Sequence, residues 1–331
     1  MLRYWLAFVL AVALPSATWA QAWQHRESGI SIPRLPDGFS VGQQNDSRRD
    51  GSDVSVQLAG SGDEIVTLYV YRSAFPAAAM WFERTRYAMR ANLGVSIDNV
   101  APRSFTLGAA TSPNGLREEI DVPGNGRWRA TAVAIAQYGE WMVKARITST
   151  MDRADVARRM DVLLGALRFP AEAPPARPLL VPAPCGEANS MNGRARRPST
   201  EDTAMASIML VGVHAEARGR EGLVANPADW CRESSRHPAE VISLYRRRDG
   251  EAWVALLGDS GLAAGAQSVG DRAFTFAANP STTTFVQMFS GMPAPDPAIE
   301  AAIPVALGRA QGTASVDAAT GTQISVAMPE G

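Results

Sequence analysis

The chain has 331 residues, of which 46% are hydrophobic and 20% charged, and its formal net charge is −1. This is an ordinary globular composition, and the length predicts about two domains. The near-neutral charge excludes the strong basic excess typical of nucleic-acid-binding proteins, so we expect no nucleic-acid partner. Lys144 is the only lysine.

Residues 1–20 have the features of a secretory signal peptide. Arg3 supplies a short positive region, an apolar run of residues 4–14 follows, and small residues permit cleavage after Ala20 or Ala22. The alternative is a buried helix. The apolar run is too short to span a bilayer comfortably, and no later segment reaches about 18 apolar residues. We therefore expect a periplasmic or secreted protein whose mature form has no transmembrane segment.

The first half alternates strand and helix patterns. Patterns of period two, separated by turn residues, predict short strands around 30–41 and 115–122 and hairpins over 53–72 and 127–150. A helix is expected between Pro76 and Gly94. A second helix is expected over 151–170, with Asp152 as its N-cap and an apolar stripe along one face.

Two stretches of this half carry a family resemblance. "GISIPRLPDGFSV" (29–41) is similar to the opening strand and proline-rich turn of the PsbP-like fold, and "RRMDVLLGALRF" (158–169) is similar to its closing helix. The resemblance covers about residues 23–170. It implies a sheet with packed helices and, because most members bind or stabilise protein partners in the envelope, a non-enzymatic role. Neither stretch lies on a recognised site, so no functional residue is carried over.

A proline-rich segment follows the first half. Six prolines lie between Pro170 and Pro184, a density that favours extended backbone. It predicts a linker over 170–184 between a first domain (21–169) and a second (185–331), with few contacts across the boundary. The alternative is a strap packed along one domain, as the apolar residues 179–181 suggest.

The second half resembles no family that we recognise. Residues 204–217 fit either a strand or a helix, and we favour a strand. Hairpins are expected over 241–257, turning at Asp249–Gly250, and over 312–328, with a strand pair at 271–279 and 282–290. A short helix is expected over 296–310, with Asp296 as cap and a kink at Pro304. The fold class is thus α+β: two small domains, each an antiparallel sheet with one or two packed helices.

The stretch "GDSG" (258–261) matches the nucleophile sequence of chymotrypsin-like proteases. A catalytic serine needs a histidine within hydrogen-bond reach and a carboxylate behind that histidine. The sequence offers three histidines, His25, His214 and His237, none in a protease-like context. A hydrolase using Ser260 is therefore the alternative hypothesis.

The chain has two cysteines, Cys185 and Cys231. An exported protein meets an oxidising compartment, so we predict that they form a disulfide. Two free thiols, or a zinc ion shared with His237, are the alternatives, although structural zinc sites usually have paired ligands at short spacing. The basic runs 194–197 and 246–248 fit solvated loops, or contacts with an anionic envelope polymer.

Taken together, these patterns favour a non-catalytic exported envelope protein. We expect a binding or assembly module whose partner is an unknown protein or envelope polymer. The sequence indicates no catalytic residue, no cofactor and no metal site. It leaves open whether the chain is an enzyme and favours the view that it is not.

Overall fold

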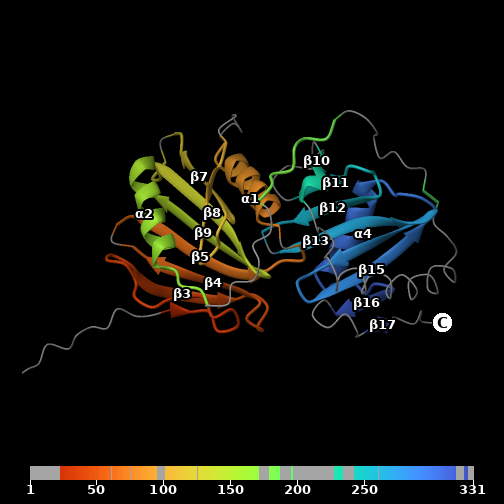
Figure 1. Ribbon diagram of the computed structural model, residues 1–331, viewed down its shortest axis with the longest axis horizontal. Coiled ribbons are helices and arrows are strands. Elements are labelled where there is room, and N and C mark those ends of the chain that lie inside the picture. The colour runs from red at the N-terminus through yellow and green to blue at the C-terminus, as the bar shows by residue number, and fades with distance from the viewer. Residues whose placement is uncertain are drawn as a thin grey trace, which may run out of the picture.

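The computed structural model describes residues 23–60, 62–75, 77–94, 101–124, 126–170, 179–186, 195–196, 227–233, 242–259, 261–317 and 324–326. Within these ranges the chain forms two large antiparallel sheets and three α-helices, an α+β architecture in two bodies (Figure 1). The expected signal peptide (1–20) and the strand expected at 204–217 lie outside the described residues.

The first sheet has seven antiparallel strands in the order β3-β4-β5-β9-β8-β7-β6. Their bounds are β3 Ser40–Asp46, β4 Asp53–Ala59, β5 Glu64–Arg72, β6 Arg103–Phe105, β7 Gly115–Asp121, β8 Ala130–Tyr138 and β9 Trp141–Ser149. A separate pair joins β1 (Trp23–Gln24) to β2 (Ser31–Ile32). The two expected hairpins are confirmed as β4–β5 and β8–β9.

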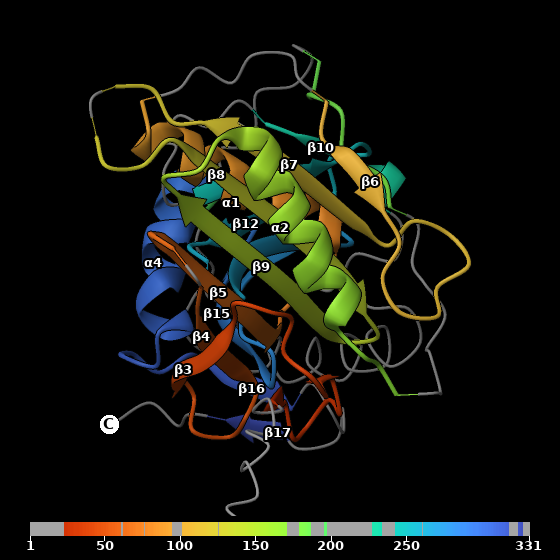
Figure 2. The same ribbon diagram turned by 90° about the vertical axis from the view of Figure 1, so that its left-hand side faces the viewer.

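Helix α2 (Arg153–Ala166) covers the outer face of this sheet and lies in front of β7, β8 and β9 in Figure 2. The predicted cap is confirmed, because the Asp152 carboxylate accepts a hydrogen bond from the Asp155 amide at 2.9 Å. Its buried stripe packs into one core cluster with the outward side chains of the strands, and consists of Val156, Met160, Leu163 and Leu164.

Helix α1 (Ala78–Asn92) covers the opposite face of the first sheet. Trp81 and Phe82 are almost wholly buried there. The helix ends, as predicted, at a glycine: Gly94 has φ 63°, a left-handed conformation that suits glycine. This helix lies between the two bodies in Figure 1.

The second sheet has eight strands that pair in sequence order. Their bounds are β10 Trp230–Arg232, β11 Ile242–Arg247, β12 Ala252–Leu257, β13 Leu262–Val269, β14 Arg272–Ala278, β15 Thr282–Phe289, β16 Ala314–Asp317 and β17 Ile324–Val326, and a short 3₁₀ turn, η1 (Pro227–Asp229), precedes β10. The expected pairings β11–β12, β14–β15 and β16–β17 are confirmed.

Helix α4 (Pro295–Ala306) covers one face of the second sheet. The predicted cap was wrong. Ala294 precedes the helix and no side chain caps it, whereas Asp296 lies in the first turn, because Pro295 begins the helix one residue earlier. Pro304 lies in the last turn and does not split the helix.

Strand β12 shows how the layers are arranged. Its sequence "AWVALL" is a continuous apolar run, which is unusual for an antiparallel strand with one solvated face. Val254 and Leu256 belong to the cluster that contains α1, whereas Trp253, Ala255 and Leu257 belong to the cluster that contains α4. The second sheet is therefore covered on both faces.

The two sheets share a hydrophobic core around α1. This cluster includes Met142 and Ile135 from the first sheet, Trp81 from α1, and Tyr245 and Phe276 from the second sheet. The expectation of few contacts across the boundary was therefore wrong. The density of prolines indicates only the backbone conformation of the linker itself. How the two halves pack is determined by apolar faces of strands that lie far from the linker in the sequence.

Candidate functional site

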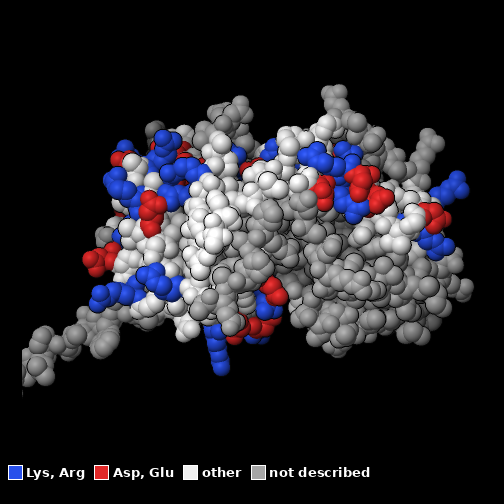
Figure 3. Space-filling view, viewed as in Figure 1, with Lys and Arg blue, Asp and Glu red and all other residues white. Residues whose placement is uncertain are grey.

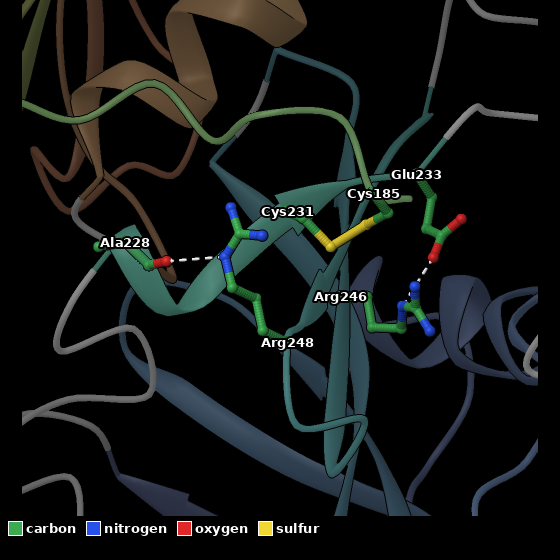
Figure 4. The surroundings of a disulfide bond; sticks show 6 residues. All are labelled: Cys185, Ala228, Cys231, Glu233, Arg246 and Arg248. Carbon is green, nitrogen blue, oxygen red and sulfur yellow. Dashed lines mark hydrogen bonds and ion pairs between the residues drawn. A yellow bond between two sulfur atoms is a disulfide. The ribbon is translucent and has the colours of Figure 1, made fainter. Parts of the chain in front are cut away.

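Cys185 and Cys231 form a disulfide in the structure, with their Cα atoms 4.9 Å apart (Figure 4). The bond ties the end of the proline-rich segment to β10. The adjacent backbone is paired as well: the Cys185 amide donates to the Arg232 carbonyl, and the Arg232 amide donates to the Ala183 carbonyl, both at 2.8 Å. Leu179 packs against the shared core. Residues 179–186 are thus attached to the fold as a strap by Leu179 and by backbone pairing, although Leu180 and Val181 are exposed.

The disulfide also removes both cysteines from the suggested zinc site, because an oxidised sulfur cannot act as a thiolate ligand. His237, the third member of that set, lies outside the described residues. Among the residues that the structure describes, no three His, Cys, Asp or Glu side chains gather as metal ligands would.

The GDSG turn connects β12 to β13 and contacts the first sheet. The Asp259 carboxylate accepts a hydrogen bond from Thr85 Oγ1 at 2.9 Å and lies 3.1 Å from Lys144 Nζ. The Gly261 carbonyl accepts a hydrogen bond from the Ala74 amide at 2.8 Å. Asp259 and Gly261 therefore hold the two bodies together. Ser260 lies outside the described residues.

Electrostatics favour the ionised form of Asp259. Partial burial raises the pKa of Asp259. The Lys144 ammonium and the Thr85 hydroxyl together lower it by more than burial raises it, so the pKa lies below the ordinary value of 3.8. The Lys144 side chain is 5% exposed, and its ammonium also lies 4.3 Å from the centre of the Tyr69 ring. This carboxylate is therefore occupied by a contact between the bodies.

A second group of buried charges also involves α1. Glu118, on β7, accepts a hydrogen bond from Arg86 Nε at 2.9 Å and pairs with Arg90. Glu83 accepts one from Arg232 Nη1, of the second body, at 2.7 Å. Each of the two carboxylates is 3% exposed and each meets two arginines. These charges are used in packing the two bodies and α1 together.

His25 is the one candidate histidine within the described residues, since His214 lies outside them as His237 does. Its Nε2 donates to the Gly51 carbonyl at 2.8 Å, which leaves Nδ1 to accept from the Ser28 hydroxyl at 2.8 Å. Burial lowers its pKa below the ordinary 6.5, and the bond to Gly51 opposes this. Both ring nitrogens of His25 are therefore engaged in structure.

Basic residues are interspersed with acidic ones on the described surface in Figure 3. Of the run 246–248, Arg246 pairs with Glu233 at 2.8 Å and Arg248 Nε donates to the Ala228 carbonyl at 3.1 Å (Figure 4). Of the run 194–197, the structure describes Arg196, whose backbone pairs with Ser290. Arg246 is buried, whereas Arg248 is exposed at the end of a hairpin and Arg196 is exposed in a loop.

The sequence did not point to a cavity of about 600 Å³ beside the C-terminal end of α2. Its wall is the loop between β6 and β7, and Asn114 fixes that loop by hydrogen bonds to the amide and carbonyl of Leu107 at 2.7 and 3.0 Å. Gly165 lines it from α2. The sequence feature that could have indicated the cavity is Gly165, an isolated glycine inside a helical pattern, where glycine costs about 1 kcal/mol relative to alanine.

No helix in the described part of the chain combines the length and the apolar character needed to cross a membrane. No protein-family model matches the chain, and a search of the curated proteins finds no match either.

Proposed function

We propose that this chain is a non-catalytic exported protein of the periplasm or the extracellular space, a binding or assembly module whose two α+β bodies act as one unit. The observation that carries the proposal is the contact of Asp259 with Lys144 and Thr85. The GDSG stretch suggested catalysis, but its carboxylate, that of Asp259, lies in the junction between the two bodies.

Three further features support this proposal. The chain contains a disulfide, which is typical of oxidising compartments. Its N-terminus has the pattern of a signal peptide. The buried acidic residues of α1 and β7 are paired with arginines. The likeness of residues 23–170 to PsbP-like proteins belongs to the same proposal.

A fluorophosphonate probe, which labels activated serines, tests the catalytic alternative. We expect no labelling of the purified, disulfide-bonded chain. Labelling that disappears in the Ser260→Ala variant would instead establish a hydrolase and overturn the proposal.

The assembly role is tested by chemical crosslinking in intact cells that express the chain natively, followed by mass spectrometry of the envelope fraction. We expect the mature N-terminus to be Gln21 or Trp23 and the chain to crosslink to a protein or polymer of the envelope. A cytoplasmic chain that retains Met1 would contradict the proposed location.

A further inference from the structure

The cavity beside α2 has the size of a small-molecule site. Its volume of about 600 Å³ lies within the range of roughly 300–1,000 Å³ that is common for ligand pockets. It is formed by three segments of the first body: the last turn of α2, the residues that follow this helix, and the β6–β7 loop.

Much of the cavity lining is apolar. Leu107, Leu164 and Leu167 are buried and belong to the core beneath α2, whereas Phe105 and Phe169 pack against that core and are partly buried. These five side chains also line the cavity, so an apolar body placed there would contact side chains that the core holds in position.

Two glycines line the cavity. A Cβ atom on Gly108 would lie 3.2 Å from the Phe169 ring, and this residue has φ 71°, so the loop approaches the ring closely. A Cβ atom on Gly165 would meet nothing within 4 Å. The surface of α2 therefore carries no side chain over the cavity at this position.

The charges around the cavity leave one positive charge in excess. Arg117 is buried and pairs with Asp161 and with Glu119, which also pairs with Arg103. Arg168, which lines the cavity, has no carboxylate partner among the described residues. The carboxylates of Asp161 and Glu119 are thus already paired with other arginines.

Arg168 is exposed, and hydrogen bonds hold its backbone and one end of its guanidinium. Its backbone pairs with Ser31 through hydrogen bonds of 2.8 and 3.0 Å. Its Nη1 donates to the carbonyls of Gly165 and Leu167 at 2.8 and 2.9 Å. Its Nε and Nη2 donate to no group that the structure describes. A guanidinium edge with these two donors matches the geometry of a carboxylate or sulfonate.

We propose that this cavity binds a small amphipathic anion, with its apolar body against the leucines and phenylalanines and its carboxylate or sulfonate on Arg168. This goes beyond the proposed function, because such a site can operate in either a binding module or an enzyme. Failure of one proposal leaves the other standing.

Two fluorescent probes that differ in charge test the proposal: 8-anilinonaphthalene-1-sulfonate and its neutral parent N-phenyl-1-naphthylamine. We expect saturable binding of the sulfonate to the folded, disulfide-bonded chain. Arg168→Gln should weaken it by about tenfold or more, since hydrogen bonds to charged groups have that magnitude. Binding of the neutral probe should change less than about twofold.

The position of the site is tested on α2 itself. Gly165→Phe adds an aromatic ring at a position that lines the cavity and should abolish binding of both probes. Val162→Phe adds the same side chain to the same helix at a position that is 47% exposed and does not line the cavity, and should leave binding unchanged. The far-UV spectrum and the urea midpoint check that each variant is folded. If Gly165→Phe fails to fold, Gly165→Leu replaces it.

Equal binding of the sulfonate to the original chain, Gly165→Phe and Arg168→Gln would overturn the proposal. An equal loss in Val162→Phe and Gly165→Phe would also overturn it, because the probe would then bind the helix surface. If the neutral probe binds as tightly as the sulfonate and both respond equally to Arg168→Gln, the assignment of an anion is wrong.

Discussion

Lys144 Nζ lies 3.1 Å from Asp259 Oδ2, and this contact joins β9 of the first sheet to the turn before β13 of the second. The two side chains differ in exposure: that of Lys144 is 5% exposed and that of Asp259 is 46% exposed. Removing the carboxylate would therefore leave a buried ammonium without its anionic partner, a costly arrangement.

We predict that Asp259→Asn lowers the free energy of unfolding by about 1–3 kcal/mol, less than for a fully buried pair because the carboxylate is partly solvated. Asp249→Asn is the matched control. Asp249 pairs with Arg247 at a hairpin end, and its side chain is 47% exposed. Its loss should cost less than about 1 kcal/mol. Urea denaturation at pH 7 measures both, and equal effects would contradict the role of Asp259.

The same carboxylate predicts a dependence on acid. Its pKa is lower in the folded chain than the ordinary 3.8, so folding favours the ionised form. The stabilisation is complete above about pH 5 and is lost as the pH falls through the folded pKa. Urea midpoints measured between pH 5 and pH 3 should fall more steeply for the original chain than for Asp259→Asn, and parallel curves would show that Asp259 does not contribute.

His25 predicts a separate effect at milder pH. Its pKa in the folded chain is lowered from 6.5, so the unfolded chain binds the proton more readily. Stability should be constant above about pH 7.5 and should decrease as the pH falls below 6.5 towards the folded pKa. His25→Asn should remove this decrease while His214 and His237 remain in both proteins. An unchanged slope of stability against pH would assign the effect to those two histidines.

Local patterns predicted much of the fold. The hairpins at residues 53–72 and 241–257 and the cap at Asp152 follow from alternation, turn residues and a side-chain oxygen at the right position. Alternation along β9 puts Met142 and Lys144 on one face of the strand. Both side chains proved to be buried, because they point to α1 and the second sheet rather than to water, whereas Arg146 on the same face is exposed.

The contacts between the bodies could not be predicted in this way. Thr85 and Asp259 are 174 positions apart, and nothing in the spacing of polar residues indicates which distant groups meet. "GDSG" suggested chemistry because short motifs carry no information about their surroundings. The cavity could not be predicted for the same reason. It forms where the β6–β7 loop, the end of α2 and Gly165 meet, and none of these three features indicates a cavity by itself.

The disulfide should contribute strongly to stability. It closes a loop with a sequence separation of 46, for which loop-closure entropy gives up to about 4 kcal/mol. We expect reduction to lower the urea midpoint, and Cys185→Ser combined with Cys231→Ser to reproduce the lower value. The double variant should not respond to dithiothreitol. A midpoint that does not move although two thiols become titratable would show that the backbone pairing of the strap suffices.

Gly261 provides the sharpest test of the junction between the two bodies. Its φ is 72°, and a Cβ atom there would lie 2.7 Å from the Arg72 carbonyl oxygen, in the first sheet. Gly270, in the hairpin between β13 and β14, has φ 62° but has nothing within 4 Å of the same position. Alanine at Gly270 should therefore cost about 1 kcal/mol, from the left-handed conformation alone. Alanine at Gly261 adds a backbone clash and should cost at least about 2 kcal/mol. Thermal and urea unfolding of the two variants measure this difference, and equal losses of stability would mean that the turn can move away from the first sheet at little cost.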